Sequence, residues 1–275
     1  MAAKKTPNIP RKKGPTRRVT AARPARAASE KSKPKPKSAK VPRVDAEQAR
    51  HTYAKLRKHY PDAHCELDHS NAFQLVVATV LSAQSTDVMV NKVTPDLFRR
   101  WPTPQALAQA EPAAVEHALS KIGMYRQKTK NVIGLAKKLI ADHGGEVPRT
   151  LAELVQLPGV GRKTANVVLG VAFGTPEGVV VDTHVQRISQ RLGWTRQTEP
   201  PEIEGDLMAL FPRSEWDMLS HTLIFHGRRT CAARKPACAA CPVSAECPSA
   251  FEAEDVGRKK TRARTAATPP AARRK

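Results

Sequence analysis

Residues 157–164 read LPGVGRKT, a glycine turn between two helical patterns, and they are the most informative part of the sequence for the fold. An amphipathic pattern over 150–156 leads into the turn, and a second apolar-rich helical pattern follows over 163–173. Gly159 and Gly161 permit positive φ and let bare backbone approach a ligand closely. The N–H groups that open the second helix form an anion site, for which a DNA phosphate is the natural occupant. A tight helical hairpin that binds nothing explains the same residues.

Helical patterns fill the rest of the central sequence. Asp45 is placed to cap a helix over 46–59, and Ser70 is placed to cap the next helix, which is apolar on nearly all sides. We therefore expect that second helix to be buried at the centre of the fold. The predicted class is all-α, with further helices near 87–99, 104–110, 112–120, 126–142, 183–192, 201–210 and 215–226.

Two local patterns add detail to this helical sequence. Ser214 and Asp217 have the three-residue spacing of a capping box, which predicts a helix start at Ser214. Val179–Val181 is the one run that looks like a β-strand, and a single strand makes no sheet. The all-α prediction therefore stands with this run included.

The net charge of +22 is concentrated at the two ends of the chain. Residues 1–43 hold 15 lysines and arginines against one acid, and residues 258–275 hold eight against none, so the part between them is neutral. Both ends, 1–43 and 251–275, are too poor in large apolar groups to offset their chain entropy, and we expect disorder there. Such basic arms attract nucleic acid by counterion release, although a solubilising extension or an organellar transit peptide explains them too. No apolar run is long enough to span a membrane.

Four of the five cysteines lie near the C-terminal end, separated by six, two and five residues. Four thiolates within 17 positions predict a metal site, and disulfides are a poor explanation without a secretory signal. Zinc and an iron–sulfur cluster both remain open, because spacing alone does not choose between them. Cys65 is far from these four and is interpreted as a small buried apolar group. The candidate ligands are Cys231, Cys238, Cys241 and Cys247.

The order and spacing of four motifs resemble the endonuclease III family of helix-hairpin-helix DNA glycosylases. The motifs are LSAQSTD at 81–87, IGMYRQK at 122–128, LPGVGRKTANVVLG from residue 157 and VDTHVQR from residue 181. The resemblance runs from about residue 44 to residue 250. It implies two helical lobes with a DNA groove between them. One lobe is a helical barrel over 65–176 that includes the hairpin, and the other combines 44–64 with 177–250.

The resemblance makes Lys163 the nucleophile and Asp182 the second catalytic residue. Lysine must be unprotonated to attack a sugar C1′, and the helix start and the neighbouring Arg162 both disfavour its ammonium form. A carboxylate at Asp182 could accept that proton and stabilise a cationic sugar, although it would also raise the lysine pKa. Without the resemblance, Lys163 is an ordinary surface or phosphate-binding lysine and Asp182 an ordinary helix cap.

The resemblance also implies residues that contact DNA. Gln84 and Met124 would project into the gap that a flipped base leaves, although Gln84 could also be a capping amide. Ser82 and Asp87 would line the pocket for the damaged base, and local helix capping explains both as well. The remaining predicted DNA contacts are Gly159, Gly161, Thr164, His184, Arg234 and Lys235.

For the cysteines, the resemblance implies a 4Fe-4S cluster that serves as structure and DNA contact, with Arg234 and Lys235 presenting charge to phosphates. Ordinary solvated charge is the alternative for these two side chains.

The implied activity is base-excision repair by a bifunctional DNA glycosylase and abasic-site lyase. Its substrate is double-stranded DNA that contains oxidised pyrimidines or abasic sites. A monofunctional adenine or mismatch glycosylase and a non-catalytic DNA-binding protein are the alternatives; the first usually lacks the lysine, and the second leaves the pairing of Lys163 with Asp182 unexplained. We expect a monomer without membrane contact, in the bacterial cytoplasm and associated with the nucleoid.

Overall fold

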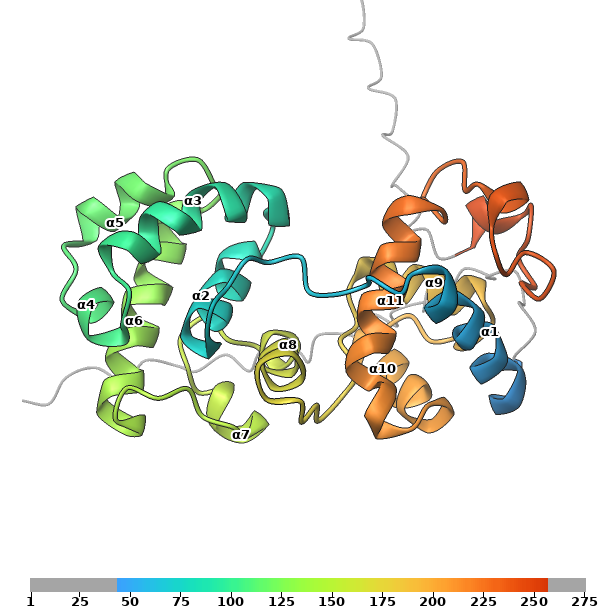
Figure 1. The fold of residues 1–275 in the computed structure, drawn as a ribbon, viewed down its shortest axis with the longest axis horizontal. Coiled ribbons are helices and arrows are strands. Elements are labelled where there is room, and N and C mark those ends of the chain that lie inside the picture. Colours follow the sequence, from blue (N-terminus) through green and yellow to red (C-terminus); the bar gives the residue numbers. More distant parts are fainter. Residues whose placement is uncertain (1–43, 257–275) are drawn as a thin grey trace, which may run out of the picture. The chain divides into compact units, whose positions relative to one another are not determined.

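A computed structural model describes residues 44–256, and these form short helices joined by loops (Figure 1). No β-strand occurs within this range, so the predicted all-α class is confirmed. The basic arm 1–43 and residues 257–275 of the predicted tail lie outside the described residues. The helices are α1 (Ala46–His59), α2 (Ala72–Ser82), α3 (Asp87–Arg100), α4 (Pro104–Ala108), α5 (Pro112–Leu119), α6 (Tyr125–His143), α7 (Leu151–Leu154), α8 (Arg162–Phe173), α9 (Thr183–Arg191), α10 (Pro200–Leu210) and α11 (Trp216–Arg229), with 3-10 helices η1 (Arg213–Glu215), η2 (Cys238–Ala240) and η3 (Ala253–Asp255).

The predicted central helix, α2, is the middle of one hydrophobic core. Eight of its 11 residues are buried, so it presents apolar groups on every side, as expected. It contacts α3, α6 and α8, which surround it in Figure 1. The apolar side chains of this core come from residues 67–169. The hairpin that contains the glycine turn is therefore anchored to the same core as α2.

A second hydrophobic core is built from α1 together with α9, α10 and α11. Its apolar residues come from 49–63 and 179–243, and its largest fully buried side chain is Trp194. The first helix of the described chain therefore packs with elements more than a hundred residues later. The division into lobes at residues 65 and 176 stays a prediction.

Helix starts follow the sequence closely, with one shift. Asp45 caps α1, and its carboxylate accepts a hydrogen bond from the backbone N–H of Gln48 at 2.8 Å. Ser70 was expected to cap α2, but this prediction is wrong because Asn71 does so, accepting from Gln74 N at 2.9 Å. The Gln74 side chain in turn accepts from Ser70 N at 2.8 Å, so a reciprocal pair fixes this helix start one residue later.

Two other local predictions are also wrong. The expected capping box at Ser214 does not form, since a 3-10 turn leads into α11 there and Asp217 instead lies 3.5 Å from His221 Nε2. The run Val179–Val181, which looks like a strand in the sequence, forms no strand within residues 44–256. Its Val180 N–H donates to the Ser220 hydroxyl at 3.0 Å, because no neighbouring strand is available to accept it.

The folded part continues beyond residue 250, where the predicted disordered tail was expected to begin. Ala253 lies in η3 and is buried, and the Val256 carbonyl accepts a hydrogen bond from Arg191 Nε at 3.0 Å. These contacts order residues 251–256 against the cysteine loop. The tail prediction is therefore wrong for these six residues.

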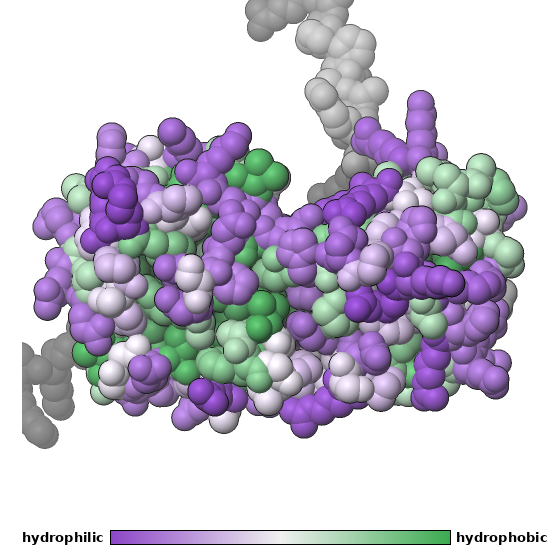
Figure 2. All heavy atoms as spheres, viewed as in Figure 1, coloured by the Kyte–Doolittle hydropathy of each residue, from purple (hydrophilic) through white to green (hydrophobic). Residues whose placement is uncertain are grey.

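The face drawn in Figure 2 is mostly hydrophilic, with hydrophobic residues visible in smaller groups. Within residues 44–256, no helix has the length and apolar character that crossing a bilayer requires. The large hydrophobic residues exposed in this range include Val88, at the start of α3, and Met124, directly before α6. Both belong to, or adjoin, the motifs singled out above.

Candidate active site

The glycine turn joins α7 to α8, and its two glycines have different reasons to be glycine. Gly159 has a φ of +79°, and a Cβ there would lie 2.9 Å from Asn131 Nδ2 and 3.0 Å from Val80 Cγ1. Gly161 is the N-cap of α8, has an ordinary φ of −95°, and a Cβ there would meet nothing within 4 Å. Gly159 is therefore required by packing, whereas Gly161 leaves the uncapped start of α8 open to a ligand.

Lys163 is exposed in the first turn of α8, immediately after this opening. Arg162, whose charge was expected to disfavour the Lys163 ammonium, is paired with Glu204, and its guanidinium donates two hydrogen bonds to that carboxylate at 2.9 and 3.0 Å. This ion pair raises the pKa of Arg162. Glu204 is only 7% exposed and also accepts from Asn166 Nδ2, so the pair anchors the start of α8 to α10.

Asp182 is the N-cap of α9. Its Oδ1 accepts hydrogen bonds from the backbone N–H groups of His184 and Val185, each at 2.8 Å. Among the described residues its hydrogen bonds are all made by Oδ1, which leaves Oδ2 available. The cap role and a catalytic role therefore use different oxygens of one carboxylate.

The charges of Lys163 and Asp182 both act on two neighbouring groups, Asp87 and His184. Burial raises the pKa of Asp87, the nearby Lys163 ammonium lowers it, and the negative charge of Asp182 raises it. Burial lowers the pKa of His184. The negative charge of Asp182 raises this pKa, whereas the positive charges of Arg187 and Lys163 lower it further. The structure thus brings together groups from α3, α8 and α9 that are as many as 97 residues apart in sequence.

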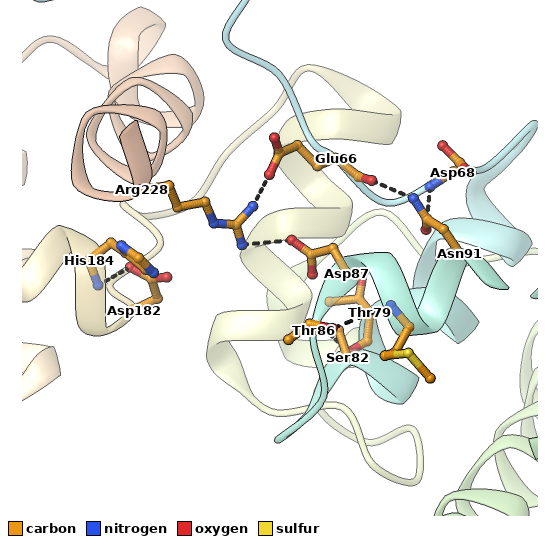
Figure 3. Close-up of polar contacts among 11 residues, drawn as sticks. Glu66, Asp68, Thr79, Ser82, Thr86, Asp87, Asn91, Asp182, His184 and Arg228 are labelled. Atoms are coloured by element: carbon orange, nitrogen blue, oxygen red, sulfur yellow. Dashed lines mark hydrogen bonds and ion pairs between the residues drawn. The ribbon is translucent and has the colours of Figure 1, made fainter. Parts of the chain in front are cut away.

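Arg228, near the end of α11, is a site residue that the sequence analysis missed. Figure 3 shows its guanidinium between Glu66 and Asp87, and it forms ion pairs with both, the second at 2.7 Å. Asn91 holds the Glu66 segment, donating to the Glu66 carbonyl at 2.8 Å and accepting from Asp68 N at 3.0 Å. No local pattern marks this arginine, since its partners lie 162 and 141 positions away.

The two predicted pocket residues behave differently. Ser82 is half-buried, and its hydroxyl donates to the Thr79 carbonyl of its own helix at 2.9 Å, as the local alternative expects. Asp87 is not the cap of α3, because Thr86 accepts from Met89 N in that role. Its carboxylate instead points toward Arg228 (Figure 3), so the capping explanation fails for Asp87.

Gln84 and Met124 lie on neighbouring loops. Each has a φ of 55°, a left-handed conformation that is uncommon for residues other than glycine. An ideal Cβ on Gly123 would lie 3.9 Å from the Gln84 carbonyl oxygen, which places the two loops in contact. Both side chains are exposed, Met124 by 50%, and the Gln84 amide caps nothing among residues 44–256.

The four C-terminal cysteines line one cavity together with Arg191 and His226. Burial, together with the neighbouring thiols of this set, raises the pKa of Cys247 to about 11. Cys241 Sγ lies 3.8 Å from His226 Nε2. Within residues 44–256, no three side chains of His, Cys, Asp or Glu are close enough to hold a single metal ion. Cys65 lies elsewhere, partly buried against the first core.

The charge beside these thiols comes from Arg191, a large side chain that is only 1% exposed. Its Nη1 donates to Cys231 Sγ at 3.2 Å, and its other hydrogen bonds go to the carbonyls of residues 231–233 and 256. No carboxylate that the structure describes pairs with this guanidinium, and thiolates or an anionic group bound by them would balance its buried charge.

The remaining predicted DNA contacts lie at the surface of their elements. Arg234 and Lys235 are exposed in the loop that follows Cys231, and Lys235 has a φ of 51°. Thr164 is half-buried in the first turn of α8. His184 is half-buried, and its Nδ1 accepts from Arg187 Nη2 at 3.2 Å, since arginine can only donate.

The chain is similar to a known superfamily and to bacterial proteins within it. Residues 77–213 match the HhH-GPD superfamily of base excision DNA repair proteins. Over 195 residues the chain is 52% identical to Endonuclease III of Synechocystis sp., covering 71% of this chain and 89% of that protein. Over 194 residues it is 49% identical to Endonuclease III of Bacillus subtilis, covering 70% and 88%.

A solved structure of a trapped endonuclease III–DNA covalent intermediate matches with a TM-score of 0.71 and 46% identity, covering 74% of this chain and 96% of that one. The class is therefore that of helix-hairpin-helix base excision DNA repair proteins. Within that class, this chain belongs to the endonuclease III family.

Proposed function

We propose that this chain removes oxidised pyrimidines from double-stranded DNA and then cleaves the abasic site by β-elimination, with Lys163 as nucleophile. The observation that carries the proposal is the shared environment of Lys163 and Asp182. The positive charge of Lys163, at the open start of α8, and the negative charge of Asp182 both shift the pKa of Asp87 and the pKa of His184. A nucleophilic amine, a carboxylate and an anion-binding helix start are what this chemistry requires.

The reaction begins when the neutral Lys163 amine attacks C1′ of the damaged nucleotide. The C1′–N bond breaks, and the base leaves with a proton. The amine loses its proton and the sugar ring opens, which gives an imine between Nζ and C1′. Loss of a proton from C2′ then expels the 3′ phosphate, and water hydrolyses the imine to regenerate the lysine.

Asp182 serves two steps through its free oxygen. While Oδ1 is held by the α9 backbone, Oδ2 can accept the proton that Lys163 loses and stabilise the positive charge that develops on the sugar. Arg162 takes no part in this, since Glu204 neutralises it. The carboxylate is therefore the group that controls the proton at this site.

The damaged base must leave the helix, and Gln84 and Met124 fill the space that it vacates. Their contacting loops and exposed side chains support this role. Asp87, held by Arg228, and the half-buried Ser82 lie beside the site as pocket residues. Extruding a damaged base costs less than extruding a normal one, which contributes to selectivity.

Cys231, Cys238, Cys241 and Cys247 would hold a 4Fe-4S cluster. The buried cation of Arg191 and the shared cavity of the four thiols suit an anionic group at this position. When bound, the cluster supplies structural cohesion and a charged platform rather than bond-breaking chemistry. The loop also carries Arg234 and Lys235, whose exposed charges can meet the DNA backbone.

The partner is duplex DNA, and we infer a monomeric enzyme that acts in the bacterial cytoplasm on nucleoid DNA. The basic ends of the chain would add sequence-independent attraction to that DNA.

The proposal is tested by following base release and strand cleavage on a duplex with one thymine glycol. Wild-type protein should do both, whereas Lys163→Ala and Asp182→Asn should lose about 100-fold or more in each. Lys130→Ala, which removes an exposed lysine of α6, is the control and should keep both activities. Base release with an intact strand in wild type would instead indicate a monofunctional glycosylase. Binding without either product would indicate a non-catalytic DNA-binding protein.

A further inference from the structure

The first turn of α6 contains a buried lysine that the proposed reaction does not use. Lys128 is 2% exposed, and burial lowers the pKa of its ammonium group. Among residues 44–256, its side chain makes one hydrogen bond, from Nζ to Ser85 Oγ at 2.7 Å. A buried ammonium is costly, so its position demands an explanation beyond a solvated surface charge.

Lys128 forms hydrogen bonds to both loops that carry the proposed gap-filling residues. Its backbone N–H donates to the Met124 carbonyl at 3.0 Å, and its side chain donates to the residue directly after Gln84. Both Gln84 and Met124 have positive φ, a conformation that a surrounding structure must hold in place. One residue therefore fixes two strained loops relative to each other.

The same face of α6 also supports the glycine turn. Lys128 and Asn131 are three positions apart in α6 and so lie on one side of it, and Asn131 packs where a Cβ on Gly159 would lie. Asn131 is itself held by Gln127, which donates to its Oδ1 at 3.0 Å. The helix that begins directly after Met124 thus also contacts the glycine turn that is proposed to hold the phosphate.

We propose that Lys128 is a positioning residue that locks the Gln84 loop to the start of α6, so that Gln84 and Met124 enter the duplex as one unit. This inference rests on the proposed function of those two side chains. Lys128 does not touch the reacting atoms, so its loss should impair base extrusion and leave the lysine chemistry intact. Loss of one hydrogen bond made by a charged group is expected to slow base release from duplex DNA by about tenfold to 100-fold.

The test compares Lys128→Met, which keeps the aliphatic stem, with Lys130→Met, an exposed lysine on the same helix. Two substrates separate extrusion from chemistry: a thymine glycol duplex, and a single strand with an abasic site, which has no gap to fill. We expect Lys128→Met to lose about tenfold or more on the duplex, and about twofold or less on the single strand. The signal of 2-aminopurine beside the lesion, which reports unstacking, should fall in parallel, and Lys130→Met should behave as wild type.

Ser85→Ala removes the other partner and serves as the second variant if Lys128→Met does not fold. It should reproduce the duplex-specific loss. Wild-type extrusion in both variants, or an equal loss on both substrates, would overturn the proposal. Gln84→Ala and Met124→Ala are measured in parallel. If these two leave extrusion unchanged, the gap-filling part of the proposed function fails; if they impair it and Lys128→Met does not, this inference alone fails.

Discussion

The two glycines of the hairpin provide a matched pair of substitutions with opposite expected effects. Gly159→Ala places a methyl group at a φ of +79°, 2.9 Å from Asn131 Nδ2 and 3.0 Å from Val80 Cγ1. The left-handed conformation costs about 1–2 kcal/mol, and overpacking adds about 1–3 kcal/mol. For a domain of this size, the sum corresponds to a fall in Tm of roughly 5–15 °C.

Gly161→Ala should be nearly neutral for folding. Its φ of −95° suits alanine, and the added methyl group meets no protein atom within 4 Å. A small loss at the N-cap is offset by lower chain entropy in the unfolded state, each below about 1 kcal/mol. The methyl group nevertheless projects into the opening at the start of α8, where the DNA phosphate is proposed to bind.

Thermal unfolding and fluorescence anisotropy on a duplex with a stable abasic-site analogue distinguish the two cases. Gly159→Ala should lower the Tm, and Gly161→Ala should keep the Tm and weaken DNA binding by about tenfold, one lost backbone contact to phosphate. A Gly159→Ala protein as stable as wild type would refute the packing argument. Unchanged DNA affinity in Gly161→Ala would refute the assignment of this opening to phosphate.

Four further predictions concern the Glu204 ion pair, the pKa of His184, the arginine beside the cysteines and the basic N-terminal arm. Glu204→Gln should reduce stability by about 1–2 kcal/mol in urea unfolding, because it weakens the bonds that hold Arg162 and Asn166; an unchanged midpoint would remove the anchor role of this carboxylate. The lowered pKa of His184 means that the unfolded state binds more protons, so stability should fall as pH decreases below about 6.5. His184→Gln should flatten that slope in acid titrations of unfolding, and a slope as steep as wild type would contradict this. Arg191→Met should lower the iron content and the visible absorbance of purified protein relative to wild type, whereas full iron occupancy, or zinc without iron, would contradict the proposed site. Deletion of residues 1–43 should weaken nonspecific DNA binding and flatten its dependence on salt, and an identical salt slope would show that the arm does not bind DNA.

Features that depend on neighbouring residues could be predicted from the sequence. The Asp45 cap, the buried character of α2 and the glycine turn all follow from residues within one or two helical turns. Asp182 was correctly expected to be a helix cap for the same reason. At these positions the local sequence preferences agree with the final fold.

Features that depend on distant partners could not be predicted. The Arg228–Asp87 pair spans 141 positions, and the Arg162–Glu204 pair spans 42, so neither leaves a periodic signal. The sequence also gives no sign that Arg162, the residue next to Lys163, is paired with a glutamate from another helix. Likewise Ser214 has the spacing of a helix cap but lies in a 3-10 turn that leads into α11, which the three-residue spacing does not predict.

The lysine mechanism is tested by identifying the residue that forms the covalent bond to the sugar. Wild-type protein is incubated with a thymine glycol duplex, the imine is reduced with borohydride, and the covalent complex is digested and mapped by mass spectrometry. We expect one modified peptide, with the sugar on Nζ of Lys163, and no trapped complex for Lys163→Ala. A trapped complex on another amine, or trapping that persists in Lys163→Ala, would contradict it.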